Sequence, residues 1–148
     1  MERKGRMLPY DAMDVARFVI ERCSLLNRPI SNLKLQKILY FLQVAFIINL
    51  QTPLFFNEIQ AWDYGPVVPD VYQKYKVFGR TNIPVTEAGN YPFDVEERRL
   101  LEKFIDEISS HSTSELVDIS HHQAPWIDAY RNSDETITPE SIKTFFTN

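Results

Sequence analysis

Cysteine and glycine are scarce in this chain of 148 residues, which has one Cys and four Gly. With a single thiol, Cys23, no disulfide can form within the chain, and its place on an apolar helix face is typical of a core residue kept reduced in the cytoplasm. A chain of this length can bury about 68–70% of its unfolded surface without a disulfide or a metal. The low glycine content argues against a sandwich of many strands joined by tight turns.

An excess of positive charge is also missing, because 16 Lys and Arg stand against 20 Asp and Glu, for a formal net charge of −4. Proteins that grip nucleic acid are usually basic, so nucleic acid is not the expected partner. Arg3, Lys4 and Arg6 form one small basic segment that could touch an acidic surface, but such a segment is more typical of a solvated terminus. We predict a flexible tail over residues 1–9. No apolar segment typical of a signal peptide follows it, which favours the cytoplasm.

The chain has no uninterrupted apolar run of the roughly 18 to 20 residues that a membrane span requires. Its longest apolar stretch covers residues 31–50, and Lys34, Gln36, Lys37 and Gln43 interrupt it. Ser31 can cap a helix there, and apolar residues then recur at three- and four-residue spacing on nearly every side. This pattern predicts a central helix surrounded by the protein itself, and no contact with a membrane.

Helix signals dominate the rest of the sequence. Asp11 can cap a first helix that ends near residue 26, and the short turn after it predicts an antiparallel hairpin with the central helix. Residues 54–62 and 82–86 have strand-like composition and predict one small two-stranded β element. The fold class is therefore mainly α: a compact single-domain bundle, residues 1–148, around the central helix. Capping or proline signals predict further helices over residues 70–78, 94–110, 112–121, from 125 and from 138.

Catalytic signatures are absent: the chain has no GxxxxGK[ST] loop, GxGxxG turn, GxSxG elbow or HExxH pair. His121 and His122 are consecutive, so on a helix they point about 100° apart and cannot share one metal ion. We predict no metal, no cofactor and no enzymatic activity. One enzymatic alternative stays open, in which His121 acts with Asp63 or Asp70 as a general acid and base in a small hydrolase.

Two segments carry more large aromatic residues than connections usually need. Residues 61–72 place Trp62, Tyr64 and Tyr72 around a rigid Gly-Pro turn, and residues 121–126 place His121 and Trp126 around a proline that begins a helix. Trp and Tyr side chains bury a large area with few rotatable bonds and keep a polar tip, which suits contact with a protein partner. They serve cores equally well, so both roles stay open.

Three motifs together resemble one family: LKLQKILYFLQ, PLFFNEIQAWDYGPVVPDVY and ISHHQAPW. In this order they are similar to the Panacea domain, the SocA-like antitoxin domain that is also found in phage-associated proteins. The resemblance extends over residues 16–146. It implies a mainly α-helical domain that neutralises a toxin encoded beside it by direct protein contact, without a cofactor. The neighbouring genes would decide between a toxin and the alternative partner, a host regulator or defence protein bound by a phage protein.

The resemblance also implies which residues matter. Ser120 stands where the family often has Thr, which keeps the hydroxyl group. Lys34 and Lys37 lie on the central helix, where lysines are usually solvated. The oligomeric state is not predicted. The partner-binding residues that we predict are Lys37, Trp62, Tyr64, Pro66, Tyr72, His121 and Trp126.

Overall fold

The computed structural model of the protein describes residues 8–147. The basic segment with Arg3, Lys4 and Arg6, and most of the predicted tail, lie outside the described residues. Leu8, within the predicted tail, packs partly buried against the core. Tyr10 then joins the fold, because its N–H donates to the carbonyl of Leu54 at 2.8 Å.

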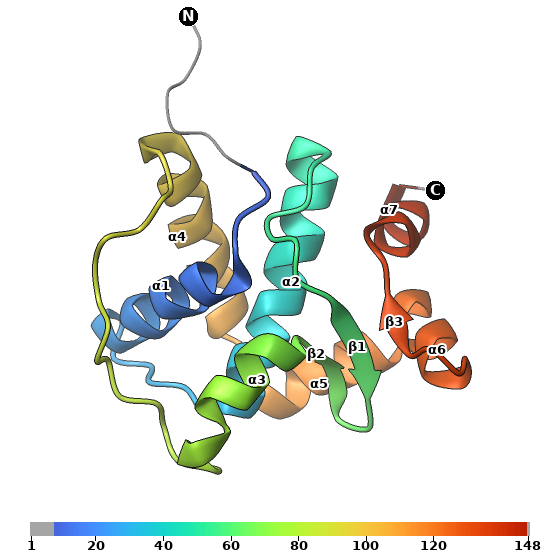
Figure 1. Ribbon diagram of the computed structural model, residues 1–148, viewed down its shortest axis with the longest axis horizontal. Coiled ribbons are helices and arrows are strands. Elements are labelled where there is room, and N and C mark those ends of the chain that lie inside the picture. The colour runs from blue at the N-terminus through green and yellow to red at the C-terminus, as the bar shows by residue number, and fades with distance from the viewer. Residues whose placement is uncertain (1–7, 148) are drawn as a thin grey trace, which may run out of the picture.

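The predicted mainly α fold is confirmed over residues 8–147, where seven α-helices accompany a small antiparallel sheet (Figure 1). The helices are α1 (Ala12–Leu25), α2 (Asn32–Leu50), α3 (Pro69–Tyr75), α4 (Val95–Ser109), α5 (Thr113–His121), α6 (Ala124–Arg131) and α7 (Pro139–Thr147). A short 3-10 helix, η1 (Lys76–Phe78), continues α3. The strands are β1 (Ile59–Trp62), β2 (Gly65–Val67) and β3 (Thr136–Ile137).

The predicted central helix is α2, which packs against α1, α3, α4, α5, α7 and β2. Ser31 caps it by accepting a hydrogen bond from the N–H of Lys34, as predicted. By length and composition alone α2 could cross a membrane, so the argument from its polar interruptions was too strict. Most of the helix is buried inside the protein, however, which is typical of the core helix of a soluble protein.

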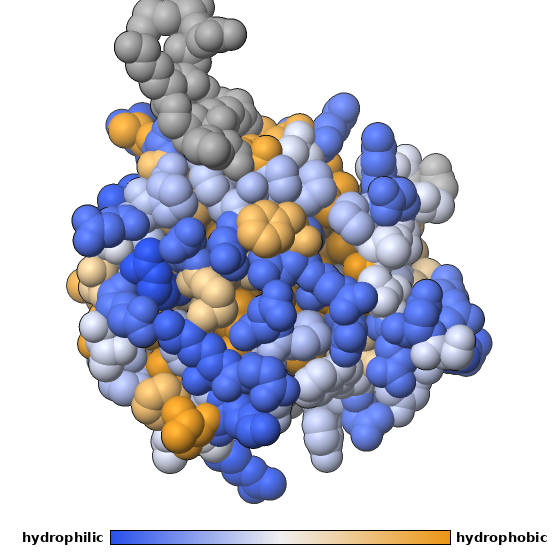
Figure 2. Space-filling view, in the orientation of Figure 1, coloured by the Kyte–Doolittle hydropathy of each residue, from blue (hydrophilic) through white to orange (hydrophobic). Residues whose placement is uncertain are grey.

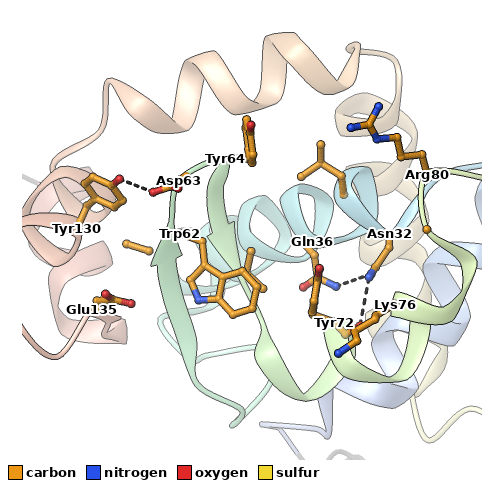
Figure 3. A pocket seen from close by; sticks show the side chains of 14 residues that line it. Asn32, Gln36, Trp62, Asp63, Tyr64, Tyr72, Lys76, Arg80, Tyr130 and Glu135 are labelled. Atoms are coloured by element: carbon orange, nitrogen blue, oxygen red, sulfur yellow. Dashed lines mark hydrogen bonds between the residues drawn. The ribbon is translucent and has the colours of Figure 1, made fainter.

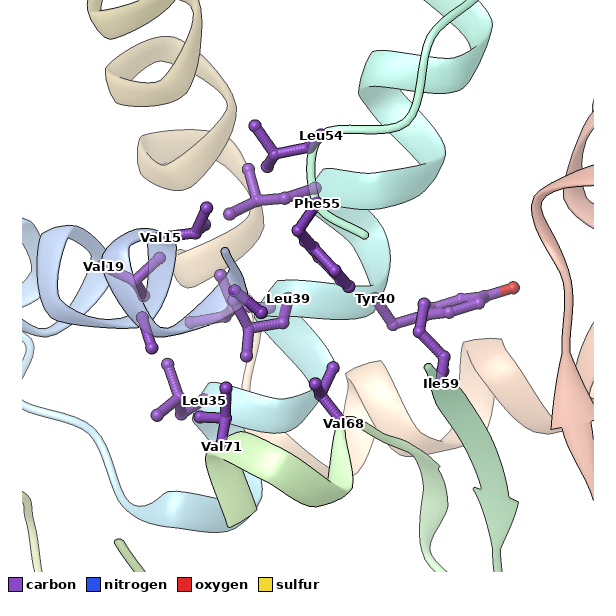
Figure 4. Close-up of a cluster of buried hydrophobic side chains, with 14 of the residues drawn as sticks. Val15, Val19, Leu35, Leu39, Tyr40, Leu54, Phe55, Ile59, Val68 and Val71 are labelled. Atoms are coloured by element: carbon purple, nitrogen blue, oxygen red, sulfur yellow. The ribbon is translucent and has the colours of Figure 1, made fainter. Parts of the chain in front are cut away.

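Side chains from α1, α2, α3 and β1 meet in the hydrophobic core that surrounds α2 (Figure 4). Gln43, one of the polar interruptions of α2, is buried in this core and bonds to the extended segment before β1. Its Oε1 accepts from the N–H groups of Leu54 and Phe55, and its Nε2 donates to the carbonyl of Phe55 at 3.0 Å. The glutamine therefore pairs backbone groups that would otherwise be buried without partners.

The predicted antiparallel hairpin of α1 and α2 is wrong, because α1 crosses α2 instead of lying alongside it (Figure 1). The apolar face of α1 is shared, since α1 contacts α3 and α4 as well as α2. Arg22 on α1 also bonds through Nε and Nη2 to the carboxylate of Asp106 on α4, at 2.8 and 2.7 Å. These contacts with α3 and α4 hold α1 across the central helix.

The sheet differs from the predicted pair of strands, because it has three strands in the order β2-β1-β3. The partner of β1 is β2, three residues further on, and Ala61 faces Pro66 across the hairpin. Gly65, the first residue after the turn of Asp63 and Tyr64, has a φ of +105°, which glycine tolerates and residues with a Cβ rarely adopt. Pro66 lies on an edge strand, where its missing N–H costs no hydrogen bond. Residues 82–86 stay outside the sheet, and Ile83 bonds to the carbonyl of Ile30 instead.

The sequence signals for helix starts are accurate in α4 and α5, each of which begins with a full capping box. In α5 the hydroxyl of Ser112 accepts from the N–H of Glu115, and the Glu115 carboxylate accepts from the N–H of Ser112. We expect Ser112→Ala to lower the free energy of unfolding by about 1 kcal/mol, because it leaves one of these N–H groups without its acceptor. Urea denaturation measures the change. Ser133→Ala is the control, since Ser133 is exposed in a turn and its side chain makes no hydrogen bond within residues 8–147. An equal loss in both variants would contradict the capping role.

Candidate functional site

A groove of about 600 Å³ opens between the first turns of α2, the β1–β2 hairpin and the α3–η1 segment. We call it the aromatic groove. Figure 3 shows Trp62, Tyr64 and Tyr72 around it, with Lys76 and Arg80 near one end and Tyr130, Asp63 and Glu135 near the other. The face of the molecule seen in Figure 2 is, by contrast, mainly hydrophilic, with small and separate apolar areas.

Three of the predicted partner-binding residues, Trp62, Tyr64 and Tyr72, line the aromatic groove. The Trp62 and Tyr72 rings meet edge to face, with centroids 5.0 Å apart. The indole N–H of Trp62 donates to Oε1 of Gln60 at 3.0 Å, which fixes the ring on the sheet. Tyr64 stands at the tip of the hairpin and is 70% exposed. An aromatic ring so exposed is a ready anchor for a protein partner.

Lys37 and Pro66 lie beneath the groove and do not reach the surface. The expectation of a solvated Lys37 is wrong, because its side chain is 0% exposed. Its Nζ donates to the carbonyl of Pro66 at 2.7 Å, and burial lowers the pKa of the amine to about 7. The position is buried because the β1–β2 hairpin lies on this face of α2. Both residues hold the hairpin against α2 and offer no side chain to a partner in this conformation.

Asn32 and Gln36, also on α2, lie beside Lys37. We call these three side chains, together with the backbone groups that they bind, the polar joint. Gln36 accepts from the N–H of Val68 at 2.9 Å and donates to the side chain of Asn32 at 2.9 Å. Asn32 donates to the carbonyl of Tyr72 at 3.2 Å. The polar joint therefore ties the hairpin and the start of α3 to one face of α2.

His121 and Trp126 lie beside the hairpin and do not line the groove. Their rings are 4.1 Å apart, and the indole N–H of Trp126 donates to the carbonyl of Trp62 at 3.0 Å. The Trp126 ring also stacks on Tyr130, with centroids 4.6 Å apart, and the Tyr130 hydroxyl donates to Asp63 at the hairpin turn. These contacts fasten α5 and α6 to the sheet.

Tyr130 is a lining residue that the sequence reasoning missed. Its signal was present, because Tyr130 follows Trp126 by four residues, and side chains at this spacing lie on one face of a helix. The hydrogen bond to Asp63, and to a lesser extent the negative charge of Glu135, raise the pKa of the Tyr130 hydroxyl. The phenol therefore keeps its proton, and keeps donating to Asp63, up to a higher pH than an ordinary tyrosine.

The alternative with His121 as a general base lacks the carboxylate partner that it requires. Nε2 of His121 is buried without a hydrogen-bond partner among residues 8–147. Asp63 accepts from Tyr130, and Asp70 accepts from the side chain of Asn57 at 2.9 Å. Among these same residues, no three His, Cys, Asp or Glu side chains lie close enough to hold a metal ion.

The family model described as "Antitoxin SocA-like, Panacea domain" matches residues 35–127. The chain belongs to this family of SocA-like Panacea domains. Among curated proteins, "Antitoxin SocA" of Caulobacter vibrioides (strain NA1000 / CB15N) is 32% identical over 129 residues, which cover 78% of this chain and 68% of that protein. No solved structure is significantly similar to this chain. Membership supports an antitoxin-like function in general and a toxin as the kind of partner.

The segment of residues 61–72, part of the second motif by which this Panacea domain resembles its family, is largely buried. At Gly65 the hairpin packs closely on its neighbours, since a Cβ there would lie 3.0 Å from Cε of Lys37 and 3.0 Å from Oγ of Ser120. Pro66, Val67, Val68 and Val71 are also buried. The motif therefore encodes the scaffold, and its aromatic members, Trp62, Tyr64 and Tyr72, reach the groove.

Proposed function

We propose that this protein neutralises a toxin by binding it directly through the aromatic groove. The observation that supports this most is Tyr64, a large ring that is 70% exposed at the tip of a hairpin fixed from below. Aromatic anchors that cluster in one place often contribute most of the binding energy of an interface. The polar joint holds the hairpin before any partner arrives, so little conformational entropy is lost on binding.

The setting that we propose follows from the family and from composition. The toxin would be encoded beside this gene, and neutralisation would need neither a cofactor nor turnover. We infer that the chain acts as one domain in the cytoplasm, since its single thiol is buried and reduced. The net charge of −4 favours a partner with a basic surface, because opposite charges speed the encounter of two proteins.

Co-expression with each neighbouring gene tests this function. Growth is measured for each neighbour alone and with the tagged protein, and the complex is isolated by its tag. We expect one neighbour to stop growth alone, to be tolerated together with this protein, and to co-purify in a fixed stoichiometry. If no neighbour is toxic and a host protein co-purifies instead, the antitoxin function is wrong.

A variant at the hairpin tip tests the surface. We expect Tyr64→Ala to weaken toxin binding by about tenfold, because it removes a central aromatic anchor. Its melting temperature should stay unchanged, since the exposed ring adds little to stability. Calorimetry measures the affinity. The matched control is Phe56→Ala, since Phe56 is also an exposed aromatic residue, 64% exposed, and it lies outside the groove. Equal weakening by both variants would contradict the assignment.

A further inference from the structure

The two ends of the aromatic groove carry opposite charges. Lys76 and Arg80 lie at the end formed by α3 and η1, and Asp63 and Glu135 lie at the opposite end, beside Tyr130 (Figure 3). Between them the lining is mostly aromatic and aliphatic. A segment that fills the groove must therefore satisfy two opposite charges across an apolar centre.

The charged side chains at the two ends make few hydrogen bonds or ion pairs within the described residues, so they can contact a partner. Over residues 8–147, Arg80 has no hydrogen bond or ion pair, and the same is true of the carboxylate of Glu135. Lys76 has one long contact, 3.5 Å from Nζ to Oε1 of Gln73. Asp63 accepts from Tyr130, so among the groove residues that the structure describes Glu135 is the carboxylate of this end that has no hydrogen bond.

A peptide could also bind as an added strand beside β2, but the backbone groups at the free edge of β2 do not favour this. Pro66 has no N–H, and its carbonyl already accepts from Lys37. Val68, the first residue after β2, has its N–H bound by the side chain of Gln36. Recognition in the groove must therefore come from side chains, since the free edge of β2 has these backbone groups occupied.

We propose that the groove binds a toxin segment with an apolar centre, an acidic residue at the end with Lys76 and Arg80, and a basic residue at the end with Glu135. The inference rests on the proposed function, because it describes the part of the toxin that enters the groove. Each end favours one sign of charge and rejects the other, so the two ends together fix the orientation of the segment.

Short fluorescent peptides with a common leucine-tryptophan-leucine centre test this polarity by fluorescence polarisation. Their flanks are acidic and basic, acidic at both ends, basic at both ends, or neutral. The wild-type protein should bind the mixed peptide about fivefold more tightly than any other. Glu135→Lys should move the preference to the doubly acidic peptide, and Lys76→Glu with Arg80→Glu to the doubly basic one. Asp128→Lys, an exposed reversal outside the groove, should change nothing.

The proposal is overturned if all variants rank the peptides alike, if none binds, or if sedimentation shows a dimer that closes the groove and dissociates in the Lys76→Glu, Arg80→Glu variant. The same variants are tested in the co-expression assay, which separates the two claims. If the protein relieves the toxicity of a neighbour but the variants do not switch their peptide preference, only the polarity of the groove is refuted. A clear switch with no neighbour relieved would support the polarity and refute the antitoxin function.

Discussion

Replacing Gly65 by alanine is expected to destabilise the protein by about 3 kcal/mol, from backbone strain and overpacking together. The backbone at this position has a φ of +105°, which residues with a Cβ rarely adopt. The new methyl group would also lie 3.0 Å from both Lys37 and Ser120, which are buried and cannot move freely. For a chain of this length, such a loss lowers the melting temperature by about 10 °C. Thermal and urea denaturation measure it.

Gly89→Ala is the matched control. Gly89 also has a positive φ, of +90°, but a Cβ there has nothing within 4 Å. It therefore reports the backbone strain without the clash, and we expect it to cost about 1 kcal/mol. If Gly65→Ala costs no more than Gly89→Ala, the close packing of the hairpin on Lys37 and Ser120 is not a determinant of stability.

The free energy of unfolding is expected to rise by about 2 kcal/mol between pH 7 and pH 9 because of Lys37. Burial lowers the pKa of this amine from 10.5 to about 7, so the folded protein loses the proton in this range while the unfolded chain keeps it. Stability rises wherever the unfolded state binds more protons. Above pH 9 the rise is opposed, because burial raises the pKa of Cys23 from 9.0 to about 11 and the unfolded thiol ionises first.

Urea denaturation at several pH values measures this effect, and Lys37→Met is the reference. Methionine keeps an unbranched side chain of similar length but cannot be protonated. The difference in stability between the two proteins should therefore change with pH between 7 and 9. A difference that stays constant would mean that the buried amine keeps an ordinary pKa.

Much of the fold was predictable because its signals are local. The caps at Asp11, Ser31, Asp94 and Ser112 depend on side chains that bond to backbone groups two or three residues away. The crossing of α1 over α2 was not predictable in this way, because it depends on contacts of α1 with α4, which is far away in the sequence. The β1–β2 hairpin is local but was missed, because Gly65 and Pro66 indicated a turn and not the start of a strand.

The candidate site was predictable in part for the same reason. Aromatic composition pointed to Trp62, Tyr64 and Tyr72, which line the groove. Lys37 was expected to be solvated because lysines on helices usually are. It is buried because the β1–β2 hairpin packs over this face of α2. The four-residue spacing from Trp126 places Tyr130 on the same face of α6, but only the packing of α6 against β1, far away in the sequence, brings Tyr130 to the groove.

The buried position of Cys23 gives this chain a built-in probe of its own opening. The thiol is 0% exposed at the junction of α1, α2 and α4, where Lys34 and Ser109 affect its ionisation. A thiol reagent can reach it only after α1 separates from its neighbours, and the chain has no second thiol to obscure the reaction. The rate of labelling therefore follows the population of opened molecules. A partner that binds only the closed form slows the labelling as its concentration rises.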